Sequence, residues 1–315
     1  MRNRRVHWAV SFLLIFAITR PAFSWGDEGH RIVARIAARN LTDQARARIA
    51  AIIRAVPSSQ DDLQLRGMLG SSGTPNAAQI ENVLATIATW PDHMPGGKKE
   101  TAPWHFIDIG LFEGPAHINE RCPRGCVNQQ ITQIFQNLKA NKPLTRFPPD
   151  RELRFLVHFL GDIHQPLHTA TDADAGANCI NAKGLEPSRE LHAVWDTALV
   201  DLVIDGSDAD TTTEIIQSLN SRRSEFQALV DPNQIAAESF GLARTAVYAK
   251  AKPAIPVINK FIDVSVSQCQ TQAPAQINAI TVDAKASYDD PATLNVIRQQ
   301  LYKGGVRLAV FLNGI

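Results

Sequence analysis

The chain has 315 residues, of which 44% are hydrophobic and 20% charged, and its formal net charge is +1. This length is enough for one large domain or two small ones. The near-neutral balance excludes a protein that binds a phosphate backbone through its overall positive charge, so any such chemistry needs a local positive site.

The first 24 residues have the pattern of a secretory signal. Three arginines lie within the first five residues, residues 9–18 form a short apolar run, and residues 22–24 are Ala-Phe-Ser. This pattern predicts cleavage before Trp25, because small residues stand where a signal peptidase reads. A membrane-anchoring first helix is the alternative, but the apolar run is too short to span a bilayer. The mature protein, residues 25–315, would be secreted or periplasmic, and losing four arginines lowers its net charge to about −3.

Helical periodicity dominates the rest of the chain, with apolar residues repeatedly spaced by three and four positions. The stretches with this pattern are Ile32–Val56, Ala77–Trp90, Asn128–Ala140, Glu152–His164, Ala236–Lys250 and Pro291–Leu312. Thr42 and Asp150 are predicted N-caps, and Pro91 is a predicted helix stop. Residues 270–291 are polar and rich in alanine, which favours a surface excursion. The sequence therefore predicts one all-α domain.

Four cysteines, an even number in an exported protein, indicate two disulfides with three possible pairings. Cys122 and Cys126 enclose Pro-Arg-Gly, which favours a small local loop between them. Cys179 would then pair with Cys269. A cysteine-rich zinc site is the alternative, but the close second pair of cysteines that such sites use is missing.

The strongest chemical signal is the stretch His158-Phe-Leu-Gly-Asp162-Ile-His164-Gln-Pro-Leu-His168. His158 and Asp162 lie four residues apart, so a helix presents both on one face. Pro166 disturbs the helix beyond them and lets His168 turn towards the same cavity. A second pair, His192 and Asp196, repeats the same spacing. Imidazole and carboxylate together are the ligands that zinc prefers when thiolates are absent.

Three shorter segments add candidate ligands: Trp90-Pro91-Asp92, Trp104-His105-Phe106 and the mature N-terminus Trp25-Gly-Asp-Glu-Gly-His30. Signal cleavage would create an α-amino group on Trp25, which loses its proton near neutral pH and can then bind metal. A single His-x3-Asp pair is more often a surface or core pair, and the tryptophans could be core aromatics. The joint pattern favours a metal site.

These motifs, in this order, resemble the zinc-dependent single-strand-specific nucleases of the S-one/P-one type, whose fold is shared with bacterial zinc phospholipases C. The resemblance runs from Trp25 to Asp196 and covers W-G-x-x-G-H, W-x-D, W-H-F, H-F-x-G-D-x-H-Q-P-L-H and L-H-x-x-W-D. It returns weakly near Arg307. It implies an all-α fold and three zinc ions.

The resemblance also implies a role for each ligand. One zinc would be held by Asp92, His105, His158 and Asp162, a second by Trp25, His30 and again Asp162, and a third by His168, His192 and Asp196. The predicted catalytic residues are Asp92, His158 and Asp162. His164 would orient its neighbours, and His93 and His117 match no ligand position. Three divalent zinc ions and three singly charged carboxylates leave a local net charge of about +3, which attracts phosphate.

The choice of substrate depends on the residues beside His105. By the same resemblance, Phe106 would stack on a base and Asp108 would hydrogen-bond its edge, while Asn178 would contact the base site. The alternative is that Phe106 packs in the core and Asp108 lies on the surface. A base reaches such a pocket only when it is unstacked, which favours single strands.

The resulting hypothesis is a secreted endonuclease and 3′-nucleotidase that cleaves single-stranded DNA and RNA to 5′-phosphate products. Its substrates would be its only partners, with no stable protein partner and no membrane, and the family implies a monomer. The first alternative is a zinc-dependent phospholipase C acting on phosphatidylcholine-like lipids, which would need an apolar surface. The second is a non-catalytic zinc-binding protein, which would not need a bridged site with open positions.

Overall fold

A computed structural model describes residues 25–55, 60–70, 72–94, 100–122, 125–141 and 147–315. The predicted signal peptide falls on residues 1–24 and lies outside the described residues. The single-domain assignment of residues 25–315 remains a prediction.

Helices dominate the described residues, as expected for the all-α prediction. The longer helices are α1 (Asp27–Ala38), α2 (Asp43–Arg54), α3 (Gln60–Leu69), α4 (Ala77–Ala88), α5 (Val127–Ala140), α6 (Pro149–Asp162), α9 (Asp208–Leu219), α11 (Pro232–Leu242) and α15 (Pro291–Asn313). The shorter ones are α7 (Leu191–Ala193), α8 (Leu199–Asp201), α10 (Arg223–Gln227), α12 (Cys269–Gln272), α13 (Ala275–Asn278) and α14 (Ala284–Tyr288). Two short strands, β1 (Asn181–Lys183) and β2 (Thr281–Asp283), pair in parallel.

Several helix boundaries differ from the predictions. The stretch from Ile32 to Val56 contains two helices, because the chain turns between α1 and α2. Thr42 caps α2 as predicted, since its side chain accepts a hydrogen bond from the Ala45 amide at 3.1 Å. The cap predicted at Asp150 is wrong: Pro148 is the N-cap and Pro149 opens α6. Proline suits the first helical position because its fixed φ matches the helix and its missing N–H would be unpaired there.

The C-terminal third also departs from the simple helical pattern. The predicted helix Ala236–Lys250 corresponds to α11 followed by a wider π turn, η6 (Ala243–Val247), and a 3-10 turn, η7 (Tyr248–Lys250). Residues 270–291 are more than a surface excursion, because they include α13, β2 and α14 and bury Ile277, Val282 and Tyr288. Alanine and polar residues outnumber the few buried apolar residues in this stretch, so its composition does not predict that it packs against the core.

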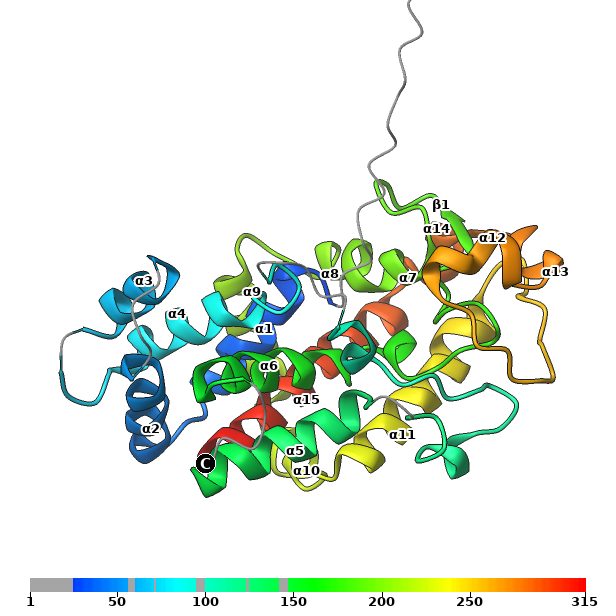
Figure 1. Cartoon of the computed structure of the whole chain (residues 1–315). Helices are drawn as coiled ribbons and strands as arrows, with labels where there is room; N and C mark the ends of the chain where they lie inside the picture. The colour runs from blue at the N-terminus through cyan, green and yellow to red at the C-terminus, as the bar shows by residue number, and fades with distance from the viewer. Residues whose placement is uncertain (1–24, 56–59, 71, 95–99, 123–124, 142–146) are drawn as a thin grey trace, which may run out of the picture.

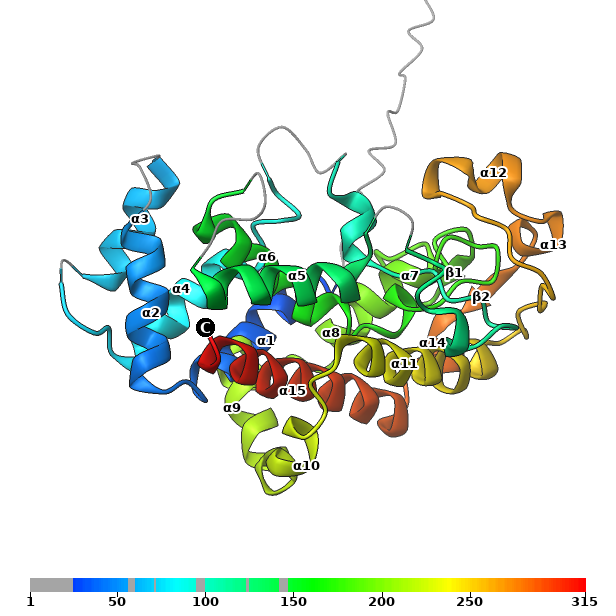
Figure 2. The same ribbon diagram turned by 60° about the horizontal axis from the view of Figure 1, so that its bottom comes forward.

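Helix α1 lies against α15 and α4, and α6 lies against α5, with α1 and α15 side by side in both views (Figures 1 and 2). Ile32, Val33 and Ile36, on the apolar face of α1, are completely buried. Helices α2, α3 and α4 gather at one end of the molecule, and α12, α13 and the strands gather at the other (Figure 1). The helices that carry the candidate site therefore lie in the middle.

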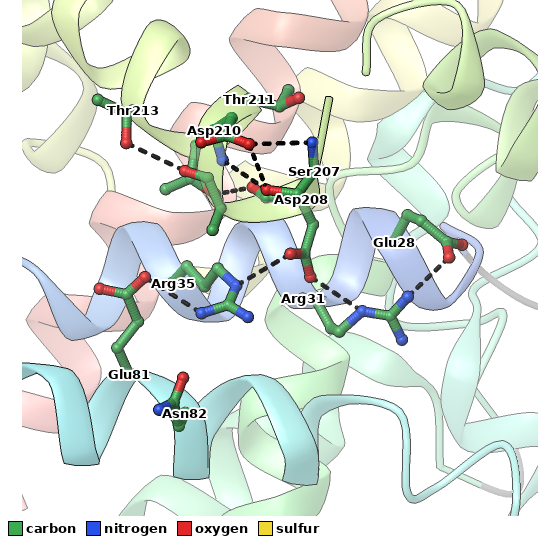
Figure 3. Close-up of polar contacts among 12 residues, drawn as sticks. Glu28, Arg31, Arg35, Glu81, Asn82, Ser207, Asp208, Asp210, Thr211 and Thr213 are labelled. Atoms are coloured by element: carbon green, nitrogen blue, oxygen red, sulfur yellow. Dashed lines mark hydrogen bonds and ion pairs between the residues drawn. The ribbon is translucent and has the colours of Figure 1, made fainter. Parts of the chain in front are cut away.

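The polar side of α1 is tied to its neighbours by ion pairs (Figure 3). Asp208, in the first turn of α9, accepts a hydrogen bond from Arg31 Nε at 3.0 Å and lies 3.4 Å from Arg35 Nε. Arg35 and Arg39 also reach Glu81 on α4, at 3.2 and 2.9 Å. These contacts fix α1 between α4 and α9.

Two disulfides confirm the favoured pairing. Cys122 bonds to Cys126, and Cys179 bonds to Cys269, with Cα–Cα distances of 5.2 and 5.1 Å. The second joins segments 90 residues apart in sequence and closes α12 onto the loop before β1. Among the described helices, none combines the length and apolar composition that crossing a bilayer requires.

Candidate metal centre

The centre of the site is built on α6 and on the turn that follows it. His158 and Asp162 lie one helical turn apart and are completely buried. Pro166 opens the 3-10 turn η3 (Pro166–His168), which carries His168 away from the helix axis. The expected disturbance by Pro166 is thus present, and it places a third histidine near the end of the helix.

Asp162 lies among three histidines from different segments. Its carboxylate oxygens lie 3.3 Å from His30 Nε2, 2.9 Å from His105 Nδ1 and 3.4 Å from His158 Nε2. His30 comes from the first turns of α1 and His105 from the 3-10 turn η1 (Ala102–His105). One carboxylate therefore contacts His30 on one side and His105 on the other, with His158 beside both, which is the position that a bridging ligand needs.

Asp92 lies beside His105 and His158. Its Oδ1 lies 3.7 Å from His158 Nε2 and 3.9 Å from His105 Nδ1, and those two nitrogens are 3.1 Å apart. Asp92, His105 and His158 form one candidate metal cluster, and His30, His158 and Asp162 form another. The two clusters share His158 and are therefore adjacent.

A third cluster is formed by His168, His192 and Asp196. His192 Nε2 lies 3.2 Å from His168 Nε2 and 3.2 Å from Asp196 Oδ2. Asp196 lies in a π turn, η4 (Val194–Ala198), inserted between α7 and α8. Such wider turns inside helices are frequent at functional sites because they re-aim side chains.

Backbone carbonyls orient the histidines. The Nδ1 atoms of His158, His168 and His192 lie 2.7, 2.8 and 2.6 Å from the carbonyl oxygens of Ala88, His105 and Gly176, respectively. When Nδ1 donates a proton to a carbonyl, Nε2 keeps its lone pair, and in all three residues Nε2 faces the clusters. Metal-binding histidines are commonly fixed in this way.

The absence of a side chain at Gly161 makes room for His30. A Cβ atom at this position would lie 2.6 Å from His30 Nδ1, a distance that real contacts do not show. His30 therefore packs directly over α6 and stacks on His158. This gives a physical reason for glycine before Asp162 in the motif.

Burial keeps two of the imidazoles in the neutral form that metals bind. Burial, the largest effect, lowers the pKa of His158 to about 3, and it also lowers the pKa of His168. Burial opposes ionisation of Asp162, but the surrounding imidazoles, His158 first, hold its pKa well below the ordinary value. Burial opposes protonation of His192, but the Asp196 carboxylate raises the pKa of this residue above its ordinary value. A neutral imidazole and an ionised carboxylate are the forms that bind metal.

Two positioning residues were not predicted from the sequence. Gln165 is fully buried and donates a hydrogen bond from Nε2 to Asp196 Oδ1 at 2.5 Å. Buried Arg307, on α15, lies with Nη1 2.9 Å from His164 Nε2, while His164 Nδ1 lies 2.7 Å from the Leu160 carbonyl. His164 thus faces away from the clusters. Gln165 stands inside the recognised motif, which was the available signal.

Four other residues predicted to take part in the site, Trp25, Phe106, Asp108 and Asn178, lie outside the three clusters. Trp25 precedes α1, and its side chain is fully buried. Phe106 is 36% exposed, and Asp108 is half-buried, with its pKa raised to about 7 by burial and by the Asp263 and Asp174 carboxylates. Asn178 Nδ2 donates to the Ala175 carbonyl at 2.8 Å, within the loop that supplies Gly176 to His192.

Both exposed histidines lie outside the clusters: His93 Nε2 lies 2.9 Å from Asp27, and His117 Nδ1 lies 3.0 Å from Glu120.

The donor set of all three clusters consists of imidazole and carboxylate groups from eight residues. These eight are His30, Asp92, His105, His158, Asp162, His168, His192 and Asp196. Buried Asp196 Oδ2 lies 3.2 Å from His192 Nε2 without forming a hydrogen bond, so this oxygen is available to a cation. A buried carboxylate of this kind requires a compensating charge. The residues present therefore fit divalent metal ions.

Comparison with known proteins decides the family. The profile of the family described as S1/P1 Nuclease matches residues 25–315. The chain belongs to the S1/P1 nuclease family. It is 28% identical to Nuclease P1 of Penicillium citrinum over 92% of this chain and 97% of that protein. It is 23% identical to Endonuclease 4 of Arabidopsis thaliana over 98% of this chain and 94% of that protein.

A shorter match relates the chain to Nuclease S1 of Aspergillus oryzae, at 28% identity over 58% of this chain and 56% of that protein. The protein is thus a hydrolase of the S1/P1 nuclease family with three candidate metal clusters. Between the two enzyme branches considered from the sequence, the match selects the nuclease over the phospholipase.

Proposed function

We propose that this S1/P1 nuclease is a zinc-dependent endonuclease and 3′-nucleotidase that cleaves single-stranded DNA and RNA to 5′-phosphate products. The observation that carries the proposal is the contact of one buried carboxylate, Asp162, with His30, His105 and His158 beside a separate third cluster. Two adjacent sites and a third nearby can hold both the attacking and the leaving oxygen of a phosphodiester.

Zinc is the ion that we assign to all three clusters. Imidazole nitrogen with carboxylate oxygen is a ligand set typical of zinc, and catalytic zinc sites keep a position open for water or substrate. When bound, such ions supply Lewis-acid chemistry and a nucleophile at neutral pH. Their charge also makes the site locally positive in a chain whose overall charge is close to neutral.

The proposed roles of the protein residues follow from their positions. Asp162 bridges the first two sites, Asp92, His105 and His158 complete one, and His30 with the N-terminus of Trp25 completes the other. His168, His192 and Asp196 hold the third. The imidazoles of His158, His168 and His192 donate hydrogen bonds to the backbone carbonyls of Ala88, His105 and Gly176, respectively. These bonds fix the orientation of the rings, so the rings need little reorientation during the reaction.

The preference for single strands rests on Phe106 and Asp108. Phe106 exposes more than a third of its surface in the segment that immediately follows His105. A base stacked on this ring would lie beside the metal clusters, with Asp108 and Asn178 at its edge. Stacking contributes about 1–3 kcal/mol per base and accepts any base, which suits an enzyme with little sequence preference. A base within a duplex cannot reach the ring without being unstacked.

Export is part of the same proposal. Cleavage of the signal before Trp25 would create the α-amino ligand, so the site would be complete only in the mature protein. The two disulfides support an oxidising compartment, either the periplasm or the medium. We propose that the mature protein acts as a monomer.

The test is to incubate the mature, zinc-loaded protein with single-stranded DNA, RNA and phosphatidylcholine side by side and to identify the product ends. Cleavage of both nucleic acids to 5′-phosphate ends, abolished by a chelator and restored by zinc, is expected. Products with 3′-phosphate ends, or hydrolysis of the lipid alone, would contradict the proposal. Addition of one residue before Trp25 should lower turnover and zinc content together.

A further inference from the structure

The segment after His105 runs beside the segment that carries His168. The Ile107 amide donates to the His168 carbonyl at 2.8 Å, and the Leu111 amide donates to the Thr171 carbonyl at 3.0 Å. In the opposite direction, the Thr171 amide donates to the Ile109 carbonyl at 3.0 Å. Residues 107–111 are thus fixed by backbone hydrogen bonds along the edge of the metal centre.

Two exposed aromatic residues flank this segment, and the residues between them are buried or half-buried. Ile107 and Ile109 are completely buried, whereas Phe106 is 36% exposed and Phe112 is 41% exposed within the described part of the chain. The chain turns twice around this segment, since the Ile109 amide donates to the Ile107 carbonyl at 3.1 Å and the Glu113 amide donates to the Gly110 carbonyl at 3.0 Å. Two aromatic rings are exposed to solvent on one short segment that starts next to the candidate metal ligand His105.

The ring of Phe112 lies over Gly110. A Cβ atom at Gly110 would approach Phe112 Cε1 to 3.2 Å, so the ring occupies the space that a side chain would otherwise fill. Gly110 lies four positions after Phe106, and four positions of chain span at most about 14 Å. Both rings therefore lie within reach of one short nucleic-acid strand.

The charge next to Phe112 is neutralised. Glu113 is held by Arg121, whose Nε lies 2.9 Å from Glu113 Oε2 and whose Nη2 contacts the other oxygen. The same guanidinium lies 3.6 Å above the centre of the Phe261 ring. The carboxylate beside the exposed ring is thus compensated and does not present an unpaired negative charge to a phosphate.

We propose that Phe112 is a second base-stacking position, which binds a further nucleobase of the same strand whose first base stacks on Phe106. This inference rests on the proposed function and adds a binding position beyond the one at Phe106. A nucleobase is the occupant that fits, because it is flat, apolar on its faces and delivered by the strand already bound at the adjacent metal centre. A mononucleotide has no second base and gains nothing from Phe112.

The test compares two substrates of the zinc-loaded enzyme: thymidine 3′-phosphate, with one base, and an oligothymidylate of about eight nucleotides, within the usual size of a single-strand site. For Phe112→Ala, we expect KM for the oligonucleotide to rise about tenfold, from the loss of one stacked base, with kcat unchanged. KM for the mononucleotide should stay the same. Phe112→Trp should restore the low KM, whereas Phe112→Leu should not, because leucine is apolar but has no π face.

Two further variants separate this inference from the proposed function. Phe106→Ala should raise KM for both substrates, and Leu63→Ala should change neither, although Leu63 is 56% exposed on α3 at the other end of the molecule (Figure 1). An unchanged oligonucleotide KM for Phe112→Ala, or an equal rise with both substrates, would overturn the second stacking position while leaving the proposed function intact. If the wild-type protein hydrolysed neither substrate, both would be overturned.

Discussion

The imidazole rings of His30 and His158 stack on each other, with centroids 3.9 Å apart and 13° between the ring planes. The two residues come from α1 and α6, and Asp162 contacts both. This contact joins the N-terminal helix to the helix that carries His158 and Asp162. Interactions that hold α1 in place should therefore affect metal binding.

Gly161→Ala should disrupt this contact. The added methyl group would overlap with His30 Nδ1, so the ring must move away from Asp162. We expect at least a tenfold loss of activity, with zinc content lowered, because supporting changes of this kind typically cost 10–100-fold in metal affinity. Elemental analysis and turnover on single-stranded DNA measure both effects. Gly241→Ala is the matched control, since a methyl group there meets no atom within 4 Å. Full zinc content in Gly161→Ala would show that the packing tolerates the methyl group.

Gln165→Leu should weaken the third cluster selectively. The substitution keeps the volume but removes the hydrogen bond to Asp196 Oδ1, which leaves this carboxylate free to rotate. Zinc affinity at this cluster should fall by about 10–100-fold. Competition with a chelator, followed by elemental analysis, should show one ion lost before the other two. Gln133→Leu, on the exposed side of α5, serves as control. Loss of all ions together would indicate general unfolding instead.

Asp208→Asn should destabilise the fold by loosening α1. The substitution removes the charge that pairs with Arg31 and Arg35 (Figure 3). Hydrogen bonds to charged, partly buried groups contribute about 1.5–3 kcal/mol, so the free energy of unfolding should fall by about 1–2 kcal/mol, because each arginine keeps a second partner. Chemical denaturation measures this change. Glu225→Gln, in an exposed pair with Arg222, should cause no measurable change. Equal effects of the two substitutions would contradict the role of Asp208.

Asp172 should make the metal-free protein less stable as pH rises. Burial, and then the Asp174 carboxylate, raises the pKa of Asp172 from 3.8 to about 6. The folded state therefore holds this proton more tightly than the unfolded state, and its contribution is lost as pH rises from about 4 to about 6. Asp172→Asn cannot titrate and keeps an oxygen for the Ile258 amide. As pH rises across this window, the Tm of Asp172→Asn minus the Tm of the wild type should increase, with both measured in the presence of chelator. A Tm difference that stays constant with pH would rule out this titration.

The sequence predicted much of the site because its strongest signals are local. His158 and Asp162 share a helical face by their spacing alone, and His192 and Asp196 repeat it. The order of the motifs then identified the family, which the full-length match confirms. The disulfide pairing followed from the short Cys122–Cys126 spacing.

The remaining features depend on contacts between distant segments, which spacing does not encode. The stacking of His30 on His158 requires α1 to lie over α6. The carbonyls that orient the histidines belong to Ala88, His105 and Gly176, which lie far from those histidines in the sequence. The N-cap at Asp150 was placed two residues late because Pro149 can itself begin a helix. Residues 270–291 look like a surface loop by composition, yet Ile277, Val282 and Tyr288 reach the core.

The central claim is that Asp162 joins two metal ions while Asp196 holds a third, and metal content tests it most directly. Elemental analysis of the purified, mature protein should give three zinc ions per chain. Asp162→Asn should retain one ion, because the paired sites lose their shared ligand, whereas Asp196→Asn should retain two. An unchanged metal content in Asp162→Asn, or a wild-type protein that binds a single ion, would contradict the account.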